Sequence, residues 1–247
     1  MKKNKTLIIV LIITYFLISI YFVFIKKDNT IYLGSSTKIK IKNNNIIMTK
    51  ENKQISMQKA KVYFDGEFID GYIRSIYEDY NNSNSFQVLD NNFNLLNSNE
   101  GLIAYTGNKK IEIANVQKVT TIKEEEKTKL KSIADENGIE GTLSDFIKIE
   151  YNLDSDKEKE IIYSYKLSNI EKDTTITIIK DKEDYEIIDI ESGKPESPGL
   201  KQSYFYKLID FNNDNTYEIV LFQSNGDDSD GEYKIYSYTN GTVINIK

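Results

Sequence analysis

Short segments in which polar and apolar residues alternate recur along most of the chain, and such alternation is typical of a half-buried β-strand. The first of them, TKIKIKNNNIIM at 37–48, has a period of two. Turn signals such as Asp65-Gly66 and Asn240-Gly241 separate neighbouring segments and favour hairpins. Two strands around a turn are predicted in each of three segments: 59–73 with Asp65-Gly66, 86–96 with Asn91-Asn92, and 101–116 with Gly107-Asn108. The other strand segments lie at 37–48, 146–151, 160–167, 174–180, 184–190, 203–209, 218–224, 232–238 and 241–246. We therefore expect a mainly β protein with antiparallel pairing.

One segment breaks the alternation and predicts a helix at 121–138, TIKEEEKTKLKSIADENG. Thr121 and Glu124 have the spacing of a capping box, and Gly138 suits the position just after a last helical turn. The apolar positions are few, namely Ile122, Leu130, Ile133 and Ala134. Such a narrow apolar stripe predicts a surface helix rather than a core helix.

The amino-terminal segment has a different character, because the 19 residues from Leu7 to Ile25 carry no charge and lysines flank both ends. A helix of this length spans a hydrocarbon core of roughly 30 Å. The competing interpretation is a cleaved signal peptide, whose apolar region is usually shorter and ends in small residues, whereas SIYFVFIKK is bulky throughout. We expect an uncleaved single-pass anchor in the cell membrane. The lysines at the amino end favour an N-terminus inside and the bulk of the chain extracellular.

Composition limits the kinds of metal site and catalytic group that the chain can form, because it has no Cys and no His. Disulfides, Cys/His zinc sites and imidazole bases are excluded, so any metal must be held by oxygen, which favours calcium or magnesium. Without the five lysines of residues 1–27, the chain has 27 basic and 38 acidic residues, a net charge of −11. Such an acidic domain repels phosphates, so no nucleic-acid partner is expected.

An internal repeat carries the strongest functional signal. YNLDSDKEKEIIYSY at 151–165 aligns without gaps with IDFNNDNTYEIVLFQ at 209–223, at an offset of 58 residues. Each copy has oxygen-bearing side chains at positions one, three, five and nine: Asn152, Asp154, Asp156 and Glu160 in the first, and Asp210, Asn212, Asp214 and Glu218 in the second. A curled loop can aim such alternate side chains at one hard cation, which requires about 6–8 oxygen ligands.

These loops lack the bidentate Glu at position twelve of an EF-hand, where Tyr163 and Leu221 occur instead. The pattern resembles the D-x-D-x-D-G-x-x-E loops of FG-GAP/VCBS-type repeats, the integrin-like calcium-binding blades of β-propellers, over roughly 140–247. The resemblance implies Ca²⁺ held by the eight residues above, and a role in adhesion or recognition. The family prefers Gly at position six, where Lys157 and Asn215 lie here. A purely structural Asx-rich turn is the alternative for both loops.

The fold class expected from these patterns is mainly β, with antiparallel blade-like repeats in a partial β-propeller-like or β-sandwich arrangement and one surface helix, preceded by a transmembrane helix. The predicted parts are a cytoplasmic tip and anchor at 1–27, a linker at 28–36, an N-terminal β-rich region ending in a helix at 37–138, and two blade-like repeats at 139–247.

The expected function is that of a membrane-anchored, extracellular, non-catalytic binding or scaffold protein of the bacterial cell surface. Its partner would be a protein or polysaccharide, and calcium would stiffen its repeats. Two alternatives stay open: a metal-free surface protein of the same fold, and a carboxylate-dependent cell-surface hydrolase. No catalytic motif supports the hydrolase, and the chain has no Trp on which a sugar ring could stack. We therefore expect that the protein is not an enzyme.

Overall fold

The computed structural model describes Thr14 and residues 29–34, 37–49, 56–78, 83–96, 102–193, 202–224 and 231–246. In this part of the chain no helix is long and apolar enough to cross a membrane. Apart from Thr14, the predicted anchor at 7–25 lies outside the described residues and stays a prediction.

The N-terminal sheet contains seven antiparallel strands in the order β3-β2-β1-β7-β4-β5-β6. These strands are β1 (Asn29–Leu33), β2 (Thr37–Lys42), β3 (Asn45–Thr49), β4 (Gln58–Phe64), β5 (Glu67–Glu78), β6 (Ser83–Asp90) and β7 (Ile103–Thr106). The linker expected at 28–36 is corrected here, because residues 29–33 form β1, which pairs with both β2 and β7. Ile31 and Leu33 are fully buried, so this short strand belongs to the core.

Two smaller antiparallel sheets follow. The outer sheet has the order β12-β11-β10-β9, and the middle sheet has the order β16-β15-β14-β13-β8. The outer strands are β9 (Thr142–Tyr151), β10 (Glu160–Ser168), β11 (Asp173–Asp181) and β12 (Asp184–Gly193). The middle strands are β13 (Gln202–Asp210), β14 (Glu218–Ser224), β15 (Glu232–Thr239), β16 (Thr242–Ile246) and the short β8 (Glu112–Ile113). The expectation of a mainly β, antiparallel fold is thus confirmed.

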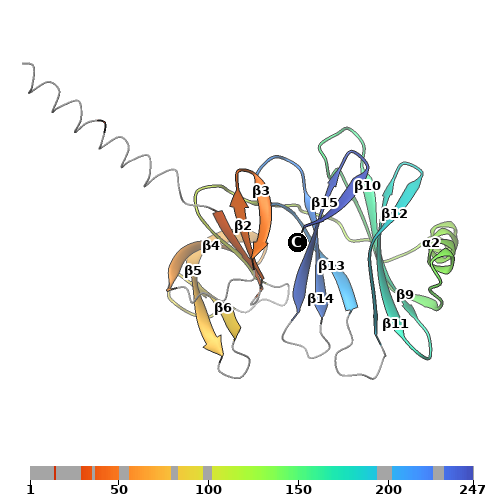
Figure 1. Ribbon diagram of the computed structural model, residues 1–247, viewed down its shortest axis with the longest axis horizontal. Helices are drawn as coiled ribbons and strands as arrows, with labels where there is room; N and C mark the ends of the chain where they lie inside the picture. The colour runs from red at the N-terminus through yellow and green to blue at the C-terminus, as the bar shows by residue number, and fades with distance from the viewer. Residues whose placement is uncertain are drawn as a thin grey trace, which may run out of the picture.

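The three sheets are stacked, with the middle sheet between the other two and the helix α2 (Glu124–Glu136) against the far side of the outer sheet (Figure 1). One core lies between the N-terminal and middle sheets and includes Ile39, Ile103, Phe211 and Val220. A second core lies between the middle and outer sheets and includes Ile149, Leu153, Ile219 and Leu221. The middle sheet is therefore apolar on both faces, which explains the unbroken apolar run IVLF in β14.

Charged groups also join the middle and outer sheets. Lys234 of β15 lies 2.7 Å from the carboxylate of Asp189 on β12 and also contacts Glu191. The hydroxyl of Tyr236 donates to Asp189 at 2.8 Å. Because Asp189 is buried, this ion pair ties the two sheets together where solvent screening is weak.

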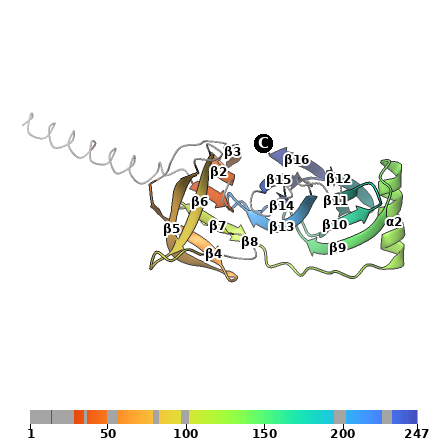
Figure 2. The same ribbon diagram turned by 90° about the horizontal axis from the view of Figure 1, so that it is seen from below.

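The helix α2 begins two to three residues later than the sequence predicts. Its first residue is Glu124, and the carboxylate of Glu126, rather than that of Glu124, accepts the N–H of Lys123 at 3.3 Å. Gly138 has φ +70° and ends the helix as expected. Leu130, Ile133 and Ala134 are buried against the outer sheet, which confirms a surface helix packed by a narrow stripe. An extended segment from β8 runs beside the sheets to reach it (Figure 2).

Candidate metal centre

The two copies of the repeat occupy equivalent places in two hairpins. The first acidic loop (residues 152–160) joins β9 to β10, and the second acidic loop (residues 210–218) joins β13 to β14. In each loop the residue at position two, Leu153 or Phe211, is fully buried. The polar loop is therefore fixed to the core by an apolar side chain just inside its start.

The loops also share hydrogen bonds at equivalent positions. The carboxylate of Glu160 accepts the N–H of Leu153 at 2.7 Å, and that of Glu218 accepts the N–H of Phe211 at 3.3 Å. Position five is an Asp in both loops, and its carboxylate accepts the N–H of the residue two positions further along. There, Asp156 accepts the N–H of Glu158 at 2.6 Å and Asp214 accepts that of Thr216 at 2.9 Å. The repeat therefore describes one local structure formed twice.

The backbone conformation agrees with the sequence only in part. Asn215 at position six has φ +67°, as the family pattern implies, whereas Lys157 at the same position is not among the residues with positive φ. Instead both loops have positive φ at position four, with +63° at Ser155 and +58° at Asn213. Asn tolerates this region well, so Asn213 offered a sequence signal, while Ser155 did not.

The first loop brings three of its four predicted ligands together. Oxygen atoms of Asp154, Asp156 and Glu160 all lie within 4.8 Å of one another, the one such group among the described residues. Ligands on opposite sides of Ca²⁺, each at 2.3–2.6 Å, are separated by about 5 Å, so this acidic group has the dimensions to hold a metal ion.

The fourth predicted ligand, Asn152, leaves an oxygen available. Its Nδ2 donates to the carbonyl oxygen of Asp156, and because that partner can only accept, the orientation of the amide is set. The Oδ1 of Asn152 is then buried with no hydrogen-bond partner. Burying an oxygen without a partner costs free energy, which a bound cation would recover.

The second loop is more deeply buried. Asp210, Asn212 and Glu218 are 1%, 7% and 3% exposed. Both Asp210 oxygens accept backbone N–H groups, from Asp214 at 3.2 Å and from Asn215 at 2.9 Å. These bonds fold Asp210 back into its own loop, so the second loop does not bring three carboxylates within the distance found in the first.

Asn212 nevertheless repeats the arrangement of Asn152. Its Nδ2 donates to the carbonyl oxygen of Asn44 at 3.0 Å and to the carboxylate of Asp214 at 2.7 Å. Both partners only accept, so the nitrogen must face them. The Oδ1 of Asn212 is buried without a partner, on an amide held against a predicted ligand.

The electrostatics of both loops favour a cation. Burial raises the pKa of Glu218 to about 8, with the N–H of Phe211 opposing the shift and the charges of Asp214 and Asp210 adding to it. Burial likewise raises the pKa of Glu160, against the opposing N–H of Leu153. A divalent cation would neutralise these groups where water does not reach them.

The two loops also contact each other, which the sequence did not reveal. The N–H of Tyr217 donates to the carbonyl oxygen of Leu153 at 2.8 Å. The hydroxyl of Ser155 donates to the carbonyl oxygen of Asn215. The rings of Tyr151 and Tyr217 meet edge to face, with centroids 5.0 Å apart. None of the residues that touch is a predicted ligand, so the ligand motif did not indicate these contacts.

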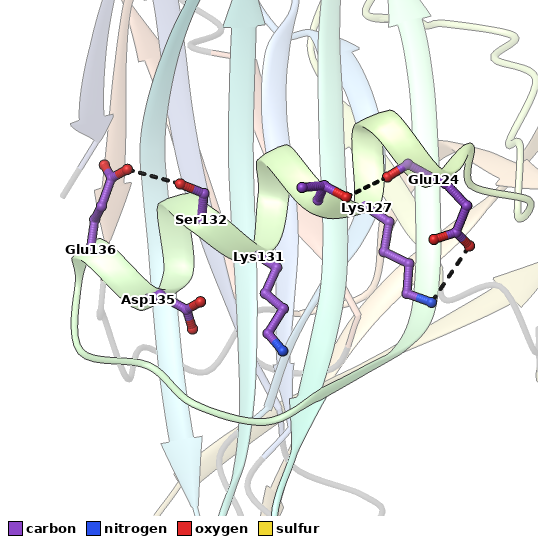
Figure 3. A pocket seen from close by; sticks show the side chains of 7 residues that line it. Glu124, Lys127, Lys131, Ser132, Asp135 and Glu136 are labelled. Carbon is purple, nitrogen blue, oxygen red and sulfur yellow. Dashed lines mark hydrogen bonds and ion pairs between the residues drawn. The ribbon is translucent and has the colours of Figure 1, made fainter.

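A separate hollow of about 410 Å³ lies along the outward side of α2 and contains none of the predicted ligands (Figure 3). Its lining comes from one helix: Glu124, Lys127, Thr128, Lys131, Ser132, Asp135 and Glu136. Glu124 and Lys127 form an ion pair at 3.7 Å, and Ser132 donates to Glu136 at 3.0 Å. These short-range pairs are those of a solvated helix face.

Comparisons of this chain with protein-family models, with curated proteins and with solved structures found no match.

Proposed function

We propose that this chain is a membrane-anchored, extracellular, non-catalytic binding or scaffold protein whose two acidic loops bind Ca²⁺. The observation that carries the calcium proposal is the first loop. There, three carboxylates converge within 4.8 Å beside a buried amide oxygen that has no partner. The second loop supports it, because the same hydrogen bonds and the same kind of unpartnered amide oxygen occur there.

The choice of calcium follows from the donor set. Each loop offers three carboxylates and one amide oxygen on a curled backbone, and Ca²⁺ accepts such irregular sets of 6–8 oxygens. Mg²⁺ demands near-ideal octahedral geometry and sheds its waters reluctantly, so it fits these loops less well. Extracellular calcium modules have dissociation constants of about 10⁻⁴–10⁻³ M, which is the range expected here.

The finer part of the fold proposal is that the middle and outer sheets are blade-like repeats. Strands β9–β12 form the outer sheet in chain order, and β13–β16 follow one another in chain order in the middle sheet, whose fifth strand is β8. The two sheets share one core. Two such units do not close a ring of 4–8 blades. On this proposal, the seven-stranded N-terminal sheet covers the open face of the middle sheet in place of a third blade.

Calorimetric titration of the full-length chain in detergent micelles tests the calcium proposal. Calcium at ten times its dissociation constant should stabilise the fold by about 1.4 kcal/mol per site and raise the Tm by roughly 3–6 °C. Asp156→Ala and Asp214→Ala, each of which removes one carboxylate, should each lower the stoichiometry by one.

The matched control is Asp135→Ala, which removes an equal charge from the exposed face of α2 and should leave binding unchanged. Identical melting curves in millimolar calcium and in chelator, with no heat of binding, would favour the metal-free alternative instead.

A further inference from the structure

The two acidic loops are joined by contacts between residues that lie next to their predicted ligands in the chain. Leu153, whose carbonyl accepts the N–H of Tyr217 at 2.8 Å, also donates its own N–H to the ligand Glu160 at 2.7 Å. Its carbonyl carbon is bonded to the backbone nitrogen of the ligand Asp154. A change in the position of either ligand therefore moves the atom to which the second loop is attached.

The contacts reach the ligands of the second loop just as directly. Tyr217 immediately precedes the ligand Glu218 in the chain. Asn215, whose carbonyl accepts the hydroxyl of Ser155, donates its N–H to the ligand Asp210 at 2.9 Å. Ser155 itself lies between Asp154 and Asp156. Each cross-loop bond thus connects a ligand of one loop to a ligand of the other through one residue at each end.

The two loops differ in how much ordering a cation would impose. Five consecutive residues of the first loop, 155–159, are exposed, against three of the second, 213–215. Asn212 is also held by the carbonyl of Asn44 in the turn between β2 and β3. Fixing an exposed residue costs backbone entropy, so the larger part of the ordering cost falls on the first loop.

We propose that the two loops bind their cations with positive cooperativity, transmitted by the Tyr217–Leu153 and Ser155–Asn215 hydrogen bonds. A cation in the second loop fixes Asn215 and Tyr217, which restrains Leu153 and Ser155 through the two cross-loop hydrogen bonds. The cation in the first loop then binds at a smaller ordering cost. Because coupling is reciprocal, each cation strengthens the binding of the other by the same factor. This inference rests on the proposed calcium binding.

Calcium titrations of four forms of the full-length chain measure the coupling: wild type, Asp156→Ala, Asp214→Ala and Ser155→Ala. In the wild type, the product of the two association constants should exceed the product of the two single-loop constants by about 5–20-fold, within the usual range of coupling. Tb³⁺ luminescence sensitised by Tyr151 and Tyr217, which lie at the ends of the two loops, gives a second measurement of each step.

Ser155→Ala removes one cross-loop bond but no predicted ligand, and the residue is exposed, so the fold is retained. It should keep two cations while lowering the coupling factor about twofold or more. Ser132→Ala, the same substitution on α2, is the control and should leave the coupling unchanged.

The outcomes separate the two proposals. Two cations that bind independently, with single-loop constants equal to those of the wild type, would overturn the coupling but leave the calcium proposal intact. A stoichiometry of one would overturn the coupling and would restrict the calcium proposal to a single loop. Absence of any calcium-dependent heat or Tb³⁺ luminescence would overturn both proposals together.

Discussion

Glu218 is a buried carboxyl group at the end of the second acidic loop, where β14 begins. It is 3% exposed, it accepts the N–H of Phe211, and it shares its loop with Asp210 and Asp214. The sequence identified all four oxygen-bearing residues of each loop by their spacing alone. It did not show that backbone N–H groups turn Asp210 back into its own loop, because that depends on φ angles at Asn213 and Asn215 that side-chain spacing does not encode.

The pKa of Glu218 predicts how stability depends on pH in the absence of calcium. Its folded pKa of about 8 is above the ordinary value of 4.5, so the folded protein binds this proton more tightly than the unfolded chain does. The contribution to stability is complete below pH 4.5 and is lost as pH rises towards 8. The free energy of unfolding should therefore fall in this window by at most about 1.4 kcal/mol per pH unit.

Urea unfolding in chelator across this pH range measures the slope, and Glu218→Gln, which cannot ionise, should flatten it. Calcium should also flatten it in the wild type, since the cation replaces the proton. An equal slope in Glu218→Gln would assign the pH dependence to other groups.

At the scale of the element, the sequence was most reliable where periodicity was strong. The strands of the middle and outer sheets lie close to their predicted positions, because each alternates or carries a long apolar run. The two strands predicted at 101–116, around the turn Gly107-Asn108, do not pair as a hairpin, because β7 belongs to the N-terminal sheet and β8 to the middle sheet. The apolar run of β1 is only the three residues IYL, with no alternation, and pairing on both sides defines this strand.

The contribution of α2 to stability can be tested, because its contact with the outer sheet depends on three buried residues, Leu130, Ile133 and Ala134. Leu130 is 1% exposed, and the hydroxyl of Tyr165 on β10 donates to its carbonyl oxygen at 3.2 Å. Leu130→Ala should lower the free energy of unfolding by about 2–5 kcal/mol, through lost burial and the cavity left behind.

The control for this helix is Lys131→Ala, one position along on the exposed face. Chemical denaturation of the two variants compares them directly. Equal stabilities would mean that the helix adds little to the fold.

At the scale of the whole molecule, the repeat in the sequence indicated two similar C-terminal units. It did not indicate that three sheets stack on one another, with the middle sheet between the other two (Figure 1). β8, which precedes the helix, pairs with β13 through Ile113 opposite Ile209 and Glu112 opposite Asp210. The edge of the middle sheet beside the second acidic loop is thus supplied by the N-terminal region. Such long-range pairing of a two-residue strand leaves no local pattern. The predicted boundary at 138/139 stays a prediction, but a cut there would leave Asp210 without its strand partner.

The predicted anchor at 7–25 would determine on which side of the membrane the three sheets lie. The full-length chain should sediment with membranes and resist washing with high salt, because about 19 apolar residues bury enough surface to hold a helix in the bilayer. Deletion of residues 1–27 should release a soluble protein with an unchanged melting temperature.

Protease added to intact cells should reach the stacked sheets if they lie outside. A chain that is fully protected in intact cells and degraded only after lysis would place the sheets on the cytoplasmic side.

The central position of β1 has a mechanical consequence. Strand β1 begins at Asn29, and it is paired with β2 along five residues and with β7 along four. Tension applied to the chain before Asn29 would therefore load two hydrogen-bonded ladders at once. An edge strand, by comparison, peels from a single neighbour. On the prediction of an anchor at 7–25, the strand that follows the anchor is thus held by neighbours on both sides.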